Sequence, residues 1–596
     1  MEKTAKKSWT TRAFLISLAV LILCSVVNWG VITGWGGVKI TRVNLIGDNG
    51  LTYSALMYTP KAASNETPLP AILMCHGMSG NARNHESWAV EYSRRGFIVI
   101  SIDNMGAGDG EYAGKFTMIP DLYMTYLESL PIVDKTRTVV AGHSFGGQMA
   151  YSVGTKHNAT AIIMANGFNL GMGSQSDETL IDYQGDMLIT SSTADKSMTE
   201  EVAQDWVNKI FGASFQLDGD AEVGTVYGSF EEGNAHQYLI LEDMVHEGVF
   251  VTPGHIEMQL DFIQTAFEVP NAIAGSNQVW MWKDVFGLLG MLAFATTLAL
   301  FALMIIDKVP FFMEIKQPLP RNIGLRGIGL AISIVAALGF PLLCLYTGTF
   351  GLVKALGGAY GANVSWLPLR VTNVALAVLI GISCLGVIML FVFWFTEGRK
   401  AKATLRDFGV TSAEDNGINF RLIGKAFLVS AITIAIGWTY LGIQGAVAGT
   451  DFYCLFFGYK PIATAKMYAY PPYIIIWILC FCIAAIGMNV ERRLPSVGNE
   501  KLDTAIAVVF NGVLGTAMIS IMVFIETKVQ VSLGQTGVAL ANWGTDITRI
   551  WGMPVGMFIG SAGNTFCYRK TGNIWLGVFL FGTICALNAV LYGQIR

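Results

Sequence analysis

The chain has 596 residues, of which 53% are hydrophobic and only 14% are charged. It is too long for one domain and too apolar for a water-soluble protein, so we expect a membrane-embedded portion. The net charge of −4 hides an acidic segment, residues 38–275, which holds 12 Lys and Arg against 29 Asp and Glu. Such a segment repels nucleic acid, so we expect no nucleic-acid partner.

Histidine and cysteine are placed unevenly along the chain. All seven histidines precede residue 256, and of the nine cysteines only Cys75 lies within residues 38–275. These residues show neither metal-ligand spacing nor a disulfide framework, so we expect no metal and no other cofactor. For a domain outside the cytoplasm, the lack of a disulfide framework favours a bacterial cell envelope.

The first apolar segment, residues 13–35, is long enough to cross about 30 Å of hydrocarbon. It follows four basic residues, Lys3, Lys6, Lys7 and Arg12. A basic tail is retained in the cytoplasm, so residues 1–37 are predicted to be a cytoplasmic tail and a transmembrane signal anchor. A cleaved signal peptide is the alternative, but no A-x-A site follows the segment.

Residues 38–275 contain no segment that could span a bilayer, and we expect them to form a soluble domain. Two alternating strands are followed by short apolar strands that alternate with helices. The expected strands are 38–47, 51–60, 71–77, 97–104, 136–144, 160–167, 186–192 and 236–243, and the expected helices are 86–95, 116–130, 145–157, 198–211 and 255–267. This order predicts an α/β sheet with flanking helices and right-handed crossovers.

Residues 276–596 are predicted to be an all-α transmembrane domain with eight spans. The apolar segments lie near 285–306, 328–348, 372–395, 426–446, 471–490, 504–525, 538–560 and 573–593. With the tail, the loops assigned to the inner side carry nineteen Lys and Arg, and those on the outer side carry six. This bias predicts a multi-pass plasma-membrane protein whose N-terminus is cytoplasmic and whose soluble domain is extracytoplasmic.

One short motif in the soluble domain carries chemistry. Residues 142–147, GHSFGG, have the form G-x-S-x-G between an expected strand and an expected helix. The glycines allow a turn tight enough to hold Ser144 in a strained conformation with its hydroxyl above the sheet. A glycine-rich turn with an incidental serine is the alternative. We expect Ser144 to be a nucleophile.

A serine needs a base, and the base needs an orienting carboxylate. Asp195 follows an apolar strand and is the candidate acid, with a helix N-cap as its alternative role. His246 follows the last expected strand and is the candidate base, with His255 as the rival. The oxyanion formed in acyl transfer needs two N–H donors, and Met78 and Phe145 occupy the expected positions.

Five stretches together carry a resemblance to a known family: AILMCHGMSG, RRGFIVISIDNMGAGDG, GHSFGG, TADK and MVHEG. They resemble the α/β-hydrolase superfamily, and within it the dienelactone-hydrolase-like esterases and related serine peptidases. The resemblance covers about 240 residues. It implies a catalytic triad of Ser144, Asp195 and His246, with Met78 and Phe145 forming the oxyanion hole.

The membrane domain resembles no transporter family that we recognise. Asp546 and Arg549 lie one turn apart in an apolar segment, so they form either a membrane site or a self-neutralising structural pair. The aromatic stretch 450–470 is either an interfacial helix beneath the hydrolase or an ordinary aromatic belt.

Three functions follow from these features. The first is a membrane-anchored extracytoplasmic serine hydrolase that cleaves an ester, with a substrate that is lipid-like or emerges from the bilayer. The second is a serine peptidase with the same triad. The third is a transporter or sensor whose hydrolase-like ectodomain binds a ligand.

Overall fold

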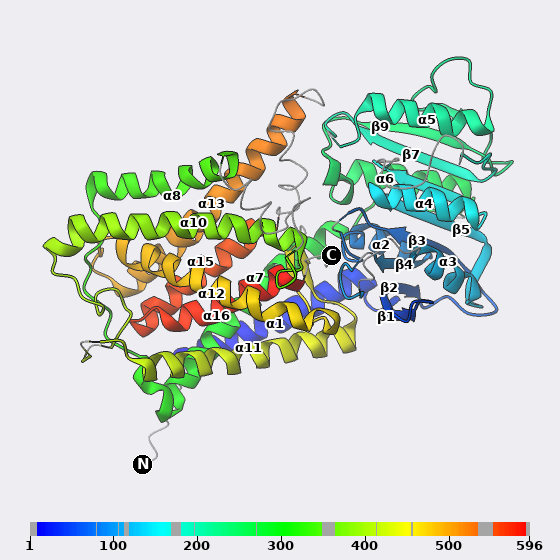
Figure 1. The fold of residues 1–596 in the computed structure, drawn as a ribbon. Coiled ribbons are helices and arrows are strands. Elements are labelled where there is room, and N and C mark those ends of the chain that lie inside the picture. Colours follow the sequence, from blue (N-terminus) through cyan, green and yellow to red (C-terminus); the bar gives the residue numbers. More distant parts are fainter. Residues whose placement is uncertain are drawn as a thin grey trace, which may run out of the picture.

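The computed structural model describes residues 9–78, 80–104, 106–111, 119–167, 180–195, 197–269, 271–347, 364–412, 414–415, 417–454, 457–533 and 552–591. It consists of a bundle of long helices and an α/β domain at one end of that bundle (Figure 1). Helix α1 (Trp9–Thr33) belongs to the bundle and leads almost directly into the first strand of the domain.

The α/β domain is built on a nine-stranded sheet with the order β1-β2-β4-β3-β5-β6-β7-β9-β8. The strands are β1 (Val38–Ile46), β2 (Thr52–Pro60), β3 (Leu69–Cys75), β4 (Ile98–Asp103), β5 (Val133–His143), β6 (Ala161–Ala165), β7 (Asp186–Ser192), β8 (Val226–Tyr227) and β9 (His236–Leu241). Strands β4, β3, β5, β6, β7 and β9 run parallel, and β1, β2 and β8 are antiparallel to their neighbours. All eight expected strands are present, and only the two-residue β8 was not expected.

Helices cover both faces of the sheet because the central strands are buried on both sides. One face packs against α3 (Ile119–Ser129), α4 (Phe145–Lys156) and α5 (Glu200–Ser214), and the other packs against α2 (Glu86–Ser93) and α6 (Pro253–Ala266). Strand β3 shows the alternation, since Leu73 joins the first core and Ile72 joins the second. The expected α/β class is therefore confirmed.

The bundle contains helices that are long and apolar enough to cross a membrane. Within the described ranges there are five such helices, Trp9–Thr33, Trp280–Lys308, Ala375–Gly398, Phe420–Ala448 and Thr464–Glu491. The remaining bundle helices are α8 (Gly327–Thr347), α13 (Glu500–Leu533), α15 (Met553–Thr571) and α16 (Trp575–Leu591). The chain thus has the helices of a membrane protein, and the full count of eight C-terminal spans stays a prediction.

The aromatic stretch 450–470, for which an interfacial helix and an ordinary aromatic belt were the two alternatives, forms a short hairpin instead of one long helix. Phe452–Cys454 (β10) pairs antiparallel with Phe457–Tyr459 (β11), and a short 3-10 helix follows at Thr464–Ala469. Phe452, Phe457 and Tyr459 are buried in the core of the bundle. All six residues of β10 and β11 are buried, so the aromatic rings of both strands pack inside the bundle.

Buried charges join the domain to the bundle. Arg83, in the loop after β3, contacts Asp451 of the bundle through Nη2, at 2.9 Å from Oδ2, and also pairs with Glu86. Lys283 of α7 (Trp280–Lys308) lies 3.7 Å from the other oxygen of Glu86. The side chains of these four residues are 6% exposed or less. The junction therefore neutralises its charges internally rather than with water.

A second contact fixes the start of helix α7. The carboxylate of Glu91 in α2 accepts hydrogen bonds from the backbone N–H groups of Val279 and Trp280, at 2.6 and 3.0 Å. A carboxylate at this position satisfies donors that the helix itself leaves open and complements the helix dipole. The soluble domain thus supplies the cap of a bundle helix.

Replacing Asp451 with Asn removes the negative charge that faces Arg83 across the junction. Because Glu86 still faces Arg83, we expect a loss of stability of up to about 3 kcal/mol rather than more. The measurement is the midpoint of thermal unfolding of the full chain in detergent, followed by tryptophan fluorescence. Glu397→Gln, which breaks the exposed pair with Lys400, should cost no more than about 1 kcal/mol. Equal midpoints for the two variants would contradict a structural role for the junction.

Candidate active site

The turn that carries Ser144 brings backbone segments into close contact. Ser144 follows β5 and precedes α4, with φ 55° and ψ −125°, a backbone conformation that non-glycine residues rarely adopt. A Cβ atom on Gly142 would lie 1.9 Å from the backbone oxygen of Gly146, and one on Gly146 would lie 1.9 Å from the oxygen of Cys75. Both glycines are therefore required by close backbone approach.

The loop after β3 lies against this turn. A Cβ atom on Gly77 would be 3.0 Å from the Cβ of Ser144, so the start of the loop touches the serine. Met78 is the next residue of the loop, and Phe145 is the first residue of α4. N–H groups in the first turn of a helix point beyond its N-terminus. The two expected oxyanion donors are thus on the two segments that flank Ser144.

Asp195 and His246 come together at the same edge of the sheet. The Nδ1 atom of His246 lies 2.6 Å from Oδ2 of Asp195. Asp195 is fully buried, and its other oxygen accepts hydrogen bonds from the backbone N–H groups of Ser197 and Met198, at 2.7 and 3.0 Å. These hydrogen bonds hold the carboxylate of Asp195 in place beside His246. A proton on Nδ1 makes Nε2 the basic nitrogen of His246.

The rival histidine has a different environment. His255, in α6, is fully buried, with Nε2 2.9 Å from the hydroxyl of Thr190 and Nδ1 3.2 Å from the carbonyl of Val249. Burial lowers the pKa of His255 to about 4. The carboxylate of Asp195 contacts His246, so the geometry favours His246 over His255 as the base.

Sequence reasoning did not identify two residues beside this pair. Asn166, which follows β6, donates from Nδ2 to Oδ2 of Asp195 at 2.8 Å and to Oγ of Ser192 at 2.7 Å. It has φ 45°, so its backbone is strained in a position that reaches the carboxylate. An Asn-Gly pair directly after a buried strand was the available signal, since Asn tolerates this conformation better than most residues.

His143, which precedes Ser144 in the motif, is the second residue that the sequence did not identify. Its Nε2 donates to the backbone oxygen of His246 at 2.9 Å, and the two imidazole rings are 4.6 Å apart. Burial lowers the pKa of His143 well below its usual value, and the neighbouring His246 and His85 act in the same direction. A neutral His143 with its proton on Nε2 therefore ties the His246 loop to the serine turn.

The expected membrane pair, Asp546 and Arg549, lies outside the described residues. The transporter or sensor alternative was based on this pair and on the number of apolar spans, and it stays a prediction.

The strand order and the order of functional groups decide the fold. The serine turn follows β5, the carboxylate follows β7 and the histidine follows the last parallel strand. The order Ser, acid, His on this sheet is that of α/β-hydrolases. The soluble domain has the α/β-hydrolase fold.

Comparisons with known proteins give short matches, and no family model matches the chain. A protein of Mycobacterium phage D29 that is assigned as a non-heme haloperoxidase is 28% identical over 86 residues, which are 14% of this chain and 31% of that protein. The quorum-quenching protein AidA of Acinetobacter baumannii is 26% identical over 147 residues, 22% of this chain and 47% of AidA. The chain thus spans less than half the length of these curated relatives.

Solved structures of an esterase and of a peptidase resemble part of the chain at low identity. The esterase LipW of Mycobacterium marinum is 16% identical, with a TM-score of 0.31, and the match covers 44% of this chain and 90% of LipW. Dipeptidyl peptidase 4 of Porphyromonas gingivalis is 15% identical, with a TM-score of 0.31, and the match covers 40% of this chain and 37% of the peptidase.

Replacing His143 with Phe keeps an aromatic ring but removes the donor to His246. A hydrogen bond of this kind contributes about 1 kcal/mol, so we expect Ser144 to react with a fluorophosphonate roughly five- to tenfold more slowly. The measurement is the second-order rate of labelling of the full chain. His143→Gln retains an N–H donor and should recover most of the rate. Equal labelling rates for His143→Gln and His143→Phe would show that the hydrogen bond from His143 to His246 does not affect the reactivity of Ser144.

Proposed function

We propose that the protein is a membrane-anchored serine hydrolase that cleaves an ester through an acyl-enzyme on Ser144, on the outer side of the plasma membrane. The contact between Asp195 and His246 is the observation that carries the proposal, because a buried carboxylate on the Nδ1 side prepares Nε2 as a base. The strained turn at Ser144 supports the assignment of the nucleophile.

In the proposed reaction, Oγ of Ser144 attacks the carbonyl carbon of the ester while its proton moves to Nε2 of His246. The N–H groups of Met78 and Phe145 stabilise the oxyanion. Collapse of this intermediate breaks the ester bond, and the departing alcohol takes the proton from His246. Water then attacks the acyl-enzyme with His246 again as base, which releases the acid and restores Ser144.

The placement of the site supports a substrate that comes from the membrane. Ser144 lies at the carboxyl ends of the parallel strands, and so do the loops that follow β3 and β4. In the loop after β3, Arg83 lies 2.9 Å from Asp451 of the bundle. In the loop after β4, Asp109 lies 3.0 Å from Lys460 of the bundle. The edge of the domain that holds the proposed site is therefore the edge that faces the bundle.

A cavity of about 980 Å³ lies at this junction. It is lined by β1 and β2, by the loop residues Arg83 and Asp109, and by the end of helix α11 (Phe420–Ala448) with residues 461–465 of the bundle. Val447 and Ile462 on its bundle side are 83% and 38% exposed. Ser144, Asp195 and His246 are not among the residues that line this cavity, so it shows open space between the domain and the bundle but not an acyl site at the serine.

The catalytic assignment is tested by labelling with a fluorophosphonate that carries a fluorophore. We expect the wild-type chain to be labelled, Ser144→Ala to be unlabelled, and His246→Ala to be labelled at least about a thousandfold more slowly, as for loss of a general base. His255→Gln is the matched control and should retain most of the rate. Equal labelling of Ser144→Ala and wild type would refute the nucleophile, and loss of labelling confined to His255→Gln would move the base to His255.

The substrate class is tested with p-nitrophenyl esters of increasing acyl length and with dipeptide p-nitroanilides. If the substrate is lipid-like, kcat/KM should rise at least about tenfold from acetyl to decanoyl, because each buried CH₂ contributes about 0.8 kcal/mol until the acyl site is filled. Cleavage of the p-nitroanilides alone would establish the peptidase alternative. A flat response to acyl length, with esters still cleaved, would remove the lipid-like substrate but keep the serine hydrolase.

A further inference from the structure

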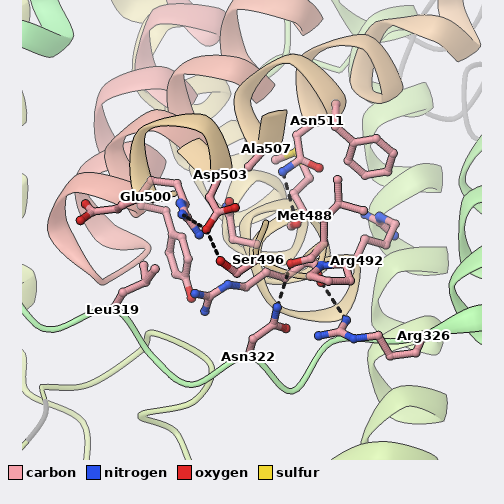
Figure 2. Close-up of a pocket in the computed structure, with 17 residues that line it drawn as sticks. Leu319, Asn322, Arg326, Met488, Arg492, Ser496, Glu500, Asp503, Ala507 and Asn511 are labelled. Atoms are coloured by element: carbon pink, nitrogen blue, oxygen red, sulfur yellow. Dashed lines mark hydrogen bonds and ion pairs between the residues drawn. The ribbon is translucent and has the colours of Figure 1, made fainter. Parts of the chain in front are cut away.

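A second cavity, of about 440 Å³, lies among the helices of the bundle (Figure 2). Its walls come from the segment before α8, residues 488–496 after α12 (Tyr470–Ile486), the start of α13 and the end of α15. The Nζ of Lys570 lies 5.2 Å from the ring of Trp9, the first residue of α1, whereas the last residue of α1 adjoins the hydrolase domain. The cavity is therefore at the end of the bundle that is remote from the hydrolase.

Basic side chains dominate the wall of this cavity. The arginines are Arg326, Arg492, Arg493 and Arg569, and the carboxylates are Glu500 and Asp503. Loop lysines and arginines that only set topology are usually solvated. Here the side chains of Arg492 and Arg569 are only 14% and 9% exposed. Two guanidinium groups are thus held largely away from water.

Among the described residues, these two arginines have only long ion pairs, with Glu491 and Asp503. The nearest carboxylate oxygen is 3.7 Å from Arg492, in Glu491, and 4.0 Å from Arg569, in Asp503. Asp503 also accepts a hydrogen bond from Ser496 (Figure 2) and one from the backbone N–H of Val497. A buried cation without a close counter-charge is costly, so an anion in the cavity would be stabilised.

The other two arginines contact only neutral groups of the described chain. Arg493 donates to the carbonyl of Pro320 at 2.7 Å, and Arg326 donates to the carbonyls of Leu325 and Arg493 at 2.8 and 3.0 Å. Carbonyl acceptors orient a guanidinium group but do not neutralise its charge. Each guanidinium group presents several N–H donors in one plane. Four such groups around one cavity match the several oxygens of a phosphate group better than they match an anion with a single acceptor atom.

We propose that this cavity binds a phosphate-bearing anion on the inner side of the membrane. The ligand is either the headgroup of an anionic phospholipid or a soluble phosphate, because both present the same oxygens. The cavity lies at the end of the bundle remote from the hydrolase, which the predicted topology assigns to the inner leaflet, so the lipid is the expected source. This site is independent of the serine hydrolase, and failure of either proposal leaves the other intact.

The test uses the full chain with Arg492→Gln and Arg493→Gln combined. In vesicles of equimolar phosphatidylglycerol and phosphatidylcholine, native mass spectrometry should show that wild type retains phosphatidylglycerol selectively. The double variant should retain at least about tenfold less, as expected for the loss of two charge-assisted hydrogen bonds. A second arm measures the shift in unfolding temperature of the detergent-purified chain on addition of inorganic phosphate.

Two comparisons make the outcome decisive. Arg399→Gln combined with Arg421→Gln removes the same charge from residues outside the cavity wall, and it should behave as wild type. Arg569→Gln alone replaces the double variant if that variant fails to fold.

Loss of lipid retention confined to the cavity variants supports the lipid as the ligand. A phosphate-induced shift that only those variants lose, with unchanged lipid retention, assigns the site to a soluble phosphate. Equal behaviour of wild type, cavity variants and control in both arms overturns the proposal.

Discussion

The serine turn depends on contact between two backbones with no room for a side chain. Because Gly146 lies against the oxygen of Cys75, the first turn of α4 is pressed onto the end of β3. This contact fixes the strained backbone of Ser144 and also sets the distance between Phe145 and the loop that carries Met78. The proposed nucleophile and both proposed oxyanion donors are thus positioned by one packing constraint rather than by three separate ones.

The same loop extends the constraint into the bundle. Residues that begin beside Ser144 at Gly77 end at Arg83, whose charge is neutralised by Glu86 in the domain and Asp451 in the bundle. Buried ion pairs contribute little net stability, but they penalise any docking that leaves one partner unpaired. The junction therefore sets the orientation of the domain on the bundle, and with it the direction that the proposed site faces.

Sequence patterns correctly predicted the features that depend on residues close together in the chain. Apolar runs buried on both faces identified the central strands, and the order of Ser144, Asp195 and His246 along the chain placed these residues at one edge of the sheet. Asn166 and His143 were not predicted from the sequence because their roles depend on contacts across the sheet, to Asp195 and to the His246 backbone. No periodicity in the sequence encodes such contacts.

The membrane part was harder to predict, for a related reason. Hydropathy finds apolar segments, but it cannot distinguish a surface helix from the hairpin that buries Phe452 and Tyr459 in the bundle. Charge counting has the same limit, since it gives Arg421 and Arg492 equal weight as topology signals. Their side chains are 75% and 14% exposed, so only the first is an ordinary solvated residue.

The two ends of the bundle also differ in how their buried charges are balanced. At the hydrolase end, Arg83 has carboxylates from both parts of the protein within hydrogen-bond distance. At the remote end, Arg492 and Arg569 have none closer than 3.7 Å within the described chain. A junction that is permanent can carry its own counter-ions, whereas a site for an exchangeable anion must leave its cations unmatched until the ligand binds. This asymmetry is the physical basis for treating the first as an interface and the second as a binding site.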